Sequence, residues 1–365
     1  MAARLDDRPD PDSSLPEAKQ RLAESDRIDL AYGASLGMAV YSLTSEAAHT
    51  VEDALAHFLV SACVARALPS LDRSVTVSEP VIINGETCES GRLHLRASEN
   101  NVVVTGDTGG TVVISASGPS TFWRHESPLR TFSMGSLGRA AITTGDWMAE
   151  WRERAPYVDC DDAGAFADQL ETAFDLLEHY TPEYFLWCTY LLREVVARKR
   201  VDVHTTTSAS YRHGFGLVEL CTPASVLETA EMLVHECSHL HFHLASWTSR
   251  LVQPDAPSVY SVLKNVARPL EMILLGFHDF GNVLLMYDRL ARSDAPIDHG
   301  DLAGRMEHVC GLVRALHSGL VPNLEWLTPS GTCLYAPLAH RLVDSGHLES
   351  EQAVREKGIA DIEVV

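Results

Sequence analysis

The segment His235-Glu236-Cys237-Ser238-His239 places two histidines four residues apart, with a glutamate directly after the first. In a helix, residues i and i+4 lie nearly one above the other on the same face, so both imidazole rings can reach one metal ion. Glu236, one position further on, can then contact a water or a substrate beside that ion. The spacing therefore predicts a metal site on a helix.

The helix that carries this segment is predicted to cover residues 226–249, because Ser225 is a suitable N-cap and apolar residues recur after it at helical spacing. His241 and His243 lie on the same helix. His243 continues the row of every fourth residue, but the angular drift of the helix takes it away from the metal. We expect both histidines to support the site or to lie at the surface.

A third ligand is required, because two imidazoles alone leave a catalytic metal under-coordinated. The candidates lie in the apolar segment 268–280, where Glu271 and His278 are seven residues apart and so share one helix face. Such groups are costly to bury unless they are paired or metal-bound. We expect His278 to be the third ligand, with Glu271 as the alternative.

The N-terminal part of the chain is predicted to contain three regions. Residues 1–15 are polar and contain prolines, which indicates a mobile tail. Residues 16–72 show apolar positions at helical spacing. Residues 73–120 contain five short β-branched runs punctuated by glycines, which is typical of antiparallel hairpins. This third region is predicted to be a structural or partner-binding lobe.

The remaining residues, 121–365, are predicted to form a helical metal-binding domain. Within it, residues 163–200 indicate two helices broken near Pro182, and the alternation in residues 214–220 indicates an exposed strand. Such a strand could pair with an extended peptide. The predicted fold class is therefore α+β and mainly helical, with an antiparallel β-rich lobe in the N-terminal half.

The formal charge of −21 and the pI near 5.1 disfavour nucleic acid and anionic membrane surfaces as partners. The acidic, proline-bearing N-terminus lacks the apolar core of a signal peptide. The eight cysteines are scattered singly, and charges interrupt the most apolar helical stretch. We therefore expect a cytoplasmic protein without a membrane span, and the sequence leaves its oligomeric state open.

Three segments resemble one known family: Gly214-Phe-Gly-Leu-Val-Glu-Leu220, the motif-bearing Ala230-Glu-Met-Leu-Val-His-Glu-Cys-Ser-His-Leu240, and Ala267-Arg-Pro-Leu270 with Gly276-Phe-His-Asp-Phe280. The family is the HExxH-motif proteins found with ribosomal peptide natural-product clusters. Its members are iron- and 2-oxoglutarate-dependent peptide β-hydroxylases with a zincin-like core. The resemblance spans roughly residues 200–290.

The resemblance implies that His235 and His239 are Fe(II) ligands. It also implies that Arg268 pairs with a carboxylate of 2-oxoglutarate, since a guanidinium group matches a carboxylate bidentately. The expected reaction is hydroxylation of a side chain, at its β-carbon, in a ribosomally made precursor peptide.

The residues themselves are also compatible with a zinc metallopeptidase. In that alternative, His235, His239 and Glu271 bind Zn²⁺, and Glu236 is the catalytic base that takes a proton from the metal-bound water. A second alternative is a non-catalytic protein that binds peptides or other partners.

Overall fold

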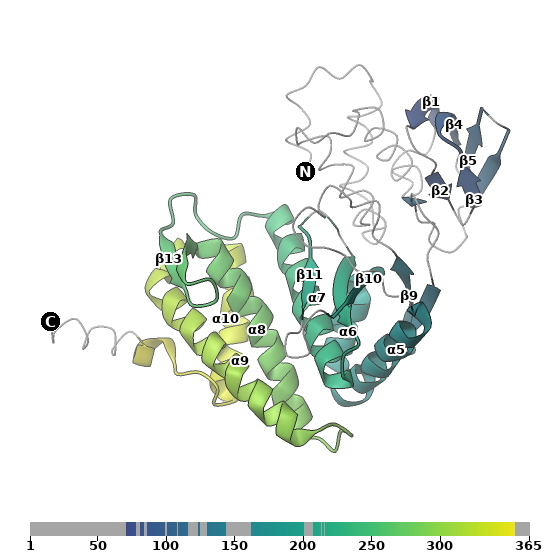
Figure 1. Cartoon of the computed structure of the whole chain (residues 1–365). Coiled ribbons are helices and arrows are strands. Elements are labelled where there is room, and N and C mark those ends of the chain that lie inside the picture. Colours follow the sequence, from purple (N-terminus) through teal and green to yellow (C-terminus); the bar gives the residue numbers. More distant parts are fainter. Residues whose placement is uncertain are drawn as a thin grey trace.

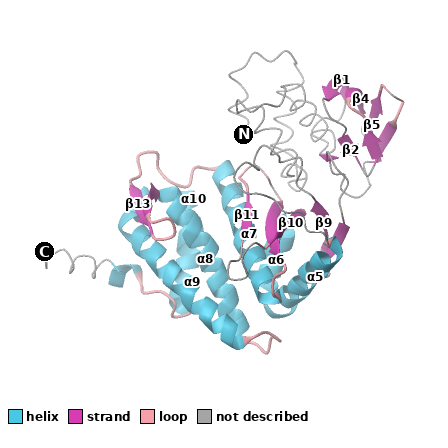
Figure 2. Ribbon diagram, viewed as in Figure 1, coloured by secondary structure: helices cyan, strands magenta, loops and turns pink. Residues whose placement is uncertain are grey.

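The computed structural model describes residues 71–354, apart from 78–80, 84–85, 99–100, 108, 116–122, 125–129, 144–161, 201–206, 213 and 215. The tail predicted at 1–15 lies outside the described residues, as does the helical region predicted at 16–72 except for its last two residues. Those two, Leu71 and Asp72, already belong to the first strand. Figures 1 and 2 show the arrangement of the elements.

The strands are β1 Leu71–Val77, β2 Val81–Ile83, β3 Glu86–Cys88, β4 Gly91–Ala97, β5 Asn101–Gly106, β6 Thr111–Ser115, β7 Trp123–Arg124, β8 Arg130–Met134, β9 Gly138–Thr143, β10 Glu194–Lys199, β11 Ser208–Ser210, β12 Leu217–Thr222, β13 Ser258–Ser261 and β14 Val266–Pro269. The helices are α5 Ala163–Tyr180, α6 Pro182–Leu191, α7 Val226–Thr248, α8 Leu270–Ala291, α9 His299–Leu320, the 3-10 helix η3 Val321–Trp326 and α10 Pro329–Asp344.

The predicted antiparallel hairpins are confirmed. Four strands form a sheet in the order β1-β4-β5-β6, and every neighbouring pair in it is antiparallel. Strand β2 pairs with β3 and β7, also in antiparallel fashion. Leu93 and Leu95, two positions apart on β4, are fully buried, as expected for a strand with one face on a core. Figure 1 shows these strands close together at the upper right.

A second, mixed sheet has the strand order β11-β12-β10-β9-β8. Its central strand β10 runs parallel to β12 and β9, while the outer strands β11 and β8 are antiparallel to their neighbours. The prediction that residues 163–200 are all helical is wrong for β10. Its core, Val195-Val196-Ala197, is a short apolar run, and periodicity alone does not distinguish such a buried strand from a helix.

The prediction of an exposed strand at residues 214–220 is also wrong. All six residues of β12 are buried, because β12 pairs with β10 on one side and with β11 on the other. Among the described strands, β11 and β8 lie at the two edges of this sheet. A strand that lies inside a sheet and under helices needs no polar face, so the apparent alternation did not report exposure.

The helices begin and end close to the predicted positions. Helix α5 ends at Tyr180 and α6 begins at Pro182, which confirms the break. Helix α7 begins directly after Ser225, whose hydroxyl accepts the backbone N–H of Glu228 while the Glu228 side chain accepts the backbone N–H of Ser225. This capping box fixes the start of the motif-bearing helix.

Helix α7 contacts strands β11 and β12 and also helix α8, and α8 in turn packs against α9. Figure 1 shows the helices α8, α9 and α10 grouped beside α7. The α+β class is therefore confirmed, with the five-stranded sheet lying inside the region predicted as helical. Within the described part of the chain, no helix combines the length and the apolar character needed to cross a membrane.

Candidate metal centre

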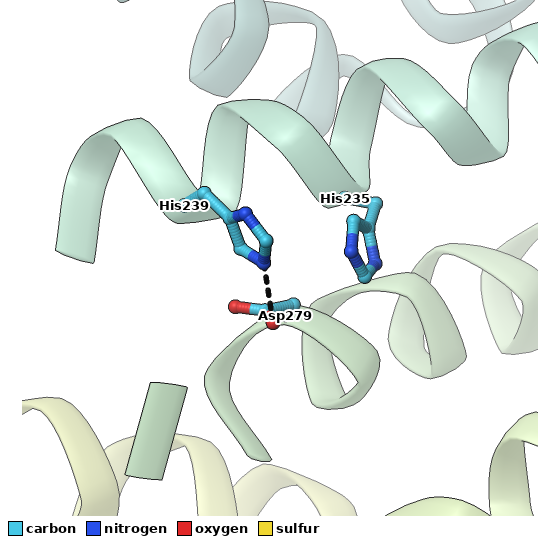
Figure 3. A group of neighbouring side chains, drawn as sticks. All are labelled: His235, His239 and Asp279. Carbon is cyan, nitrogen blue, oxygen red and sulfur yellow. Dashed lines mark hydrogen bonds and ion pairs between the residues drawn. The ribbon is translucent and has the colours of Figure 1, made fainter. Parts of the chain in front are cut away.

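Three side chains from two helices converge beside α7. His235 and His239 project from α7 and Asp279 from α8, and one potential ligand atom from each lies within 4.8 Å of the other two. The Nε2 atom of His239 is 2.7 Å from Oδ2 of Asp279. Figure 3 shows both imidazole rings extending from α7 toward the carboxylate on α8. The predicted convergence of two histidines on one side of the helix is present in the structure.

Helix packing sets this geometry. The centroids of the His235 and His239 rings are 4.7 Å apart, as the four-residue spacing requires. The edge of the Phe280 ring packs against His235, with 5.0 Å between ring centroids. Asp279 is only 2% exposed, because nearly all of α8 is apolar and buried. The carboxylate is thus held beside the two rings in a nearly dry environment.

The residues fit a divalent cation. Oδ2 of Asp279 contacts His239, but Oδ1 is buried and has no hydrogen-bond partner among the described residues. An unsatisfied buried carboxylate oxygen is energetically costly, and a bound cation would remove that cost. Two imidazoles and one carboxylate are also a donor set typical of zinc and of non-heme iron.

The electrostatics of His239 and Glu236 are dominated by neighbouring charges. Burial alone would lower the pKa of His239, but the charge of Asp279 outweighs burial and raises that pKa well above its usual value. Burial alone would raise the pKa of Glu236, but the hydrogen bond with His239 and the charges of both rings lower it to about 2. Glu236 is therefore a carboxylate at neutral pH.

Glu236 lies on the side of His239 away from Asp279. Its Oε2 atom is 3.4 Å from Nδ1 of His239, whereas Asp279 faces Nε2 on the other edge of the ring. The Glu236 side chain is buried, and the hydroxyls of Ser208 and Ser210 donate to its two carboxylate oxygens. From the sequence we predicted that Glu236 contacts a water or a substrate beside the ion. In the structure its carboxylate instead contacts the two serines and His239.

The structure does not bring His278 into the group. Its ring lies beside Trp187 and Phe242, with 5.9 Å between ring centroids in each case, and it is hydrogen-bonded to the backbone of Ser238. Burial lowers the pKa of His278 to about 4, so the ring is neutral at pH 7. The side chain beside the two motif histidines comes instead from the next residue, Asp279.

Glu271 and Arg268 also lie apart from the group. Glu271 is in the first turn of α8, eight residues before Asp279, which corresponds to about 12 Å along the helix axis. Arg268 is in β14, before α8 begins. The segment predicted to supply the third ligand is thus the right one, but a different residue of it reaches the histidines.

His241 and His243 are not part of the group. The His241 ring stacks on Trp187 with 3.6 Å between ring centroids, and its Nε2–H donates to the Trp187 carbonyl at 2.9 Å. Burial lowers the pKa of His241 to about 4. His241 thus ties α7 to α6, and the Trp187 indole N–H adds a second tie by donating to Ser238 at 3.2 Å.

Asp279 was not among the residues predicted from the sequence, although a signal for it exists. An aspartate inside an apolar helix is as costly to bury as Glu271 or His278. We expected the helix face that carries Glu271 and His278 to turn toward the metal, because these residues are seven positions apart. Asp279 is one position further along, and its side chain therefore points about 100° away from that face.

No family model matches the sequence, and a search of curated proteins finds no match either.

Proposed function

We propose that this chain is a mononuclear metalloenzyme with Fe(II) held by His235, His239 and Asp279, and that it uses 2-oxoglutarate to hydroxylate a side chain of a peptide. The observation that carries the proposal is the convergence of two imidazoles and one carboxylate whose second oxygen is buried without a described partner. This is the 2-His-1-carboxylate set of non-heme iron oxygenases. The choice of 2-oxoglutarate and of a peptide comes from the family resemblance.

When bound, Fe(II) supplies the redox chemistry by which a 2-oxoacid and O₂ oxidise a C–H bond. His235, His239 and Asp279 would hold the ion, and small molecules would supply its remaining ligands. Asp279 supplies the negative charge, and its burial at the α7–α8 contact keeps bulk water from that side. Phe280 packs on His235 and limits the rotation of its ring.

A zinc metallopeptidase is the alternative that the same donors support, because Zn²⁺ also binds histidine and carboxylate in sites with an open position. The motif helix contacts β11, an edge strand, and an edge strand can pair with an extended peptide. This arrangement suits a peptide substrate for the oxygenase and for the peptidase. The two functions therefore differ in the metal and in the reaction.

The experiment compares the protein loaded anaerobically with Fe(II) and the protein loaded with Zn²⁺. With iron, 2-oxoglutarate and O₂, we expect succinate to form and a mixed-sequence peptide library to gain the mass of one oxygen. Asp279→Ala should abolish both, whereas Asp344→Asn, on an exposed carboxylate of α10, should change neither. Hydrolysis of the library with zinc and no 2-oxoglutarate turnover would favour the peptidase. Failure to bind either metal would favour an interaction protein.

A second variant tests the role that the resemblance gives to Arg268. If its guanidinium group pairs with 2-oxoglutarate, Arg268→Ala raises the 2-oxoglutarate concentration needed for half-maximal succinate formation and leaves iron binding unchanged. Because Arg268 lies in β14 and outside the group of ligands, an unchanged requirement would assign the cosubstrate to other residues.

A further inference from the structure

Both carboxylate oxygens of Glu236 accept hydrogen bonds from the edge strand β11. Ser208 Oγ donates to Oε1 and Ser210 Oγ donates to Oε2, each at 2.6 Å. The two serines are two positions apart and therefore lie on the same face of the strand, toward α7. Glu236 is 1% exposed, so these serines and His239 contact a buried negative charge.

The donor and the acceptor of each hydrogen bond at Ser210 can be assigned. The Ser210 hydroxyl has one hydrogen, and since that hydrogen is donated to Glu236, its oxygen is free to accept from His239 Nδ1, which is 3.2 Å away. In the structure Nε2 donates its hydrogen to Asp279, and if a cation replaces that hydrogen, the hydrogen held on Nδ1 defines the neutral tautomer with its lone pair on Nε2. Nε2 is the atom that faces Asp279, so the chain from Glu236 through Ser210 prepares His239 to bind a cation on that edge.

This geometry does not suit Glu236 as a catalytic base. A base must lie within hydrogen-bond reach of the proton that it removes. The Glu236 carboxylate faces Nδ1 of His239, on the opposite edge of the ring from the metal position, and each of its oxygens already accepts a serine hydroxyl. Removal of a proton from a water on the metal would require the side chain to leave this setting.

We propose that Ser208, Ser210 and Glu236 form a positioning unit that fixes the tautomer and orientation of His239 and thereby raises the affinity of the site for its metal. The inference rests on the proposed function, because it concerns a ligand of the same ion. Carboxylates that hold a ligating histidine from its far side are a known way to orient the ring and increase its basicity. Here the hydroxyl that completes the unit comes from another element, strand β11.

The test measures metal affinity by titration with Co²⁺, followed by its visible absorption bands, and by competition with Zn²⁺. We expect Glu236→Gln and Ser210→Ala to weaken binding about 10- to 100-fold, the range found when such outer partners are removed. Ser210→Thr keeps the hydroxyl and should restore binding to within about threefold of the wild type. Ser246→Ala, on α7 with a hydroxyl that donates to the His243 carbonyl, is the matched control and should bind as the wild type does.

The absorption spectrum gives a second readout. If His239 changes its orientation, the Co²⁺ bands change even in a variant that can still be fully loaded with metal. If Glu236→Gln binds metal as tightly as the wild type, with the same spectrum, but has no activity, Glu236 is a base and the inference is overturned. Equal affinity of Ser210→Ala and wild type overturns it as well, whether or not Glu236→Gln folds. If the wild type binds no metal, the proposed function itself has failed.

Discussion

Helix α7 carries two polar clusters, and they differ in how completely their charges are paired. At its N-terminal end, Glu228 accepts hydrogen bonds from Arg200, from Arg305 and from the backbone N–H of Ser225. Glu231, one turn later, accepts from Arg305 and from the Tyr287 hydroxyl. Every charged group of this first cluster has an oppositely charged partner.

The second cluster, at the middle of the helix, is different. Asp279 faces His239 through one oxygen, while the other is buried without a partner among the described residues, as is Nδ1 of His278 next to it. Native proteins satisfy nearly all buried polar atoms, so exceptions that gather at one place indicate a missing ligand or a functional constraint. The first cluster therefore stabilises the fold, whereas the second leaves a buried charge incompletely paired where the proposed metal would bind.

The largest expected effect is the loss of metal binding in Asp279→Asn. The variant keeps the shape of the side chain but removes the charge, and we expect metal affinity to fall by more than about 100-fold, beyond the range for outer partners. Without metal, the free energy of unfolding should fall only slightly, because the amide oxygen can still accept a hydrogen bond from His239, while a buried carboxylate oxygen without a described partner is gone. Metal titration and urea unfolding of the metal-free protein measure the two effects.

The wild type provides the internal control for this prediction. Addition of metal should raise its unfolding temperature in proportion to the logarithm of the free metal concentration, because the ion binds only the folded state. The same addition should leave the unfolding temperature of Asp279→Asn unchanged. A clear loss of stability in the metal-free variant would contradict the contrast between the two clusters.

Arg305→Ala probes the first cluster and should lower the stability of the protein while leaving its metal affinity unchanged. Arg305 contacts three carboxylates, those of Glu228, Glu231 and Asp301, and its removal leaves the first two short of a partner. These ion pairs are only partly buried, and loss of hydrogen bonds to charged groups destabilises a protein by about 2 kcal/mol. We expect a loss of that size in urea unfolding, with metal affinity per folded molecule unchanged. A variant with normal stability but weak metal binding would show that the clusters had been assigned the wrong way round.

These two clusters also show what the sequence could predict. The limits of α7, its Ser225 cap and the pairing of His235 with His239 follow from local rules that act within a few residues. The hairpins of the N-terminal half follow in the same way, from short β-branched runs and glycine turns. The α+β class could therefore be derived from the sequence alone.

The third side chain of the site could not be derived in this way. Helix α8 is buried around most of its circumference, so its apolar pattern does not define which face turns toward α7. His278 and Asp279 were equally placed on that evidence, and only packing separates them. The role of Glu236 was hidden for a related reason, since Ser208 and Ser210 reach it from another element 26 to 28 residues away.

The pH dependence of stability gives a sharper test of the first cluster. Burial alone would raise the pKa of Glu228, but Arg200, the Ser225 N–H and Arg305 lower it to about 2. A carboxylate with a depressed pKa in the folded state adds stability that is complete above its unfolded pKa of about 4.3 and is lost as the pH falls toward 2. The contribution of Glu228 to stability is therefore on the order of 1–3 kcal/mol at neutral pH, after allowance for screening by solvent.

Urea unfolding between pH 6 and pH 2.5 measures this contribution when the wild type is compared with Glu228→Gln. The wild type should lose more stability on acidification than the variant, since the amide does not titrate. Taking the difference removes the titration of the other carboxylates, which both proteins share. Parallel curves would mean that Glu228 is not held by its arginines in solution.

The smallest expected effect, in Ser225→Ala, tests whether the two clusters are independent. The Ser225 hydroxyl accepts the Glu228 N–H at the first turn of α7, and loss of such a cap costs about 1 kcal/mol. His235 is ten residues further along, or about 15 Å of helix, and stability effects at such separation are usually additive. Metal affinity should therefore match that of the control Ser246→Ala. If Ser225→Ala weakens metal binding, α7 transmits strain from its cap to the site, and pairing at the first cluster then sets the geometry of the second.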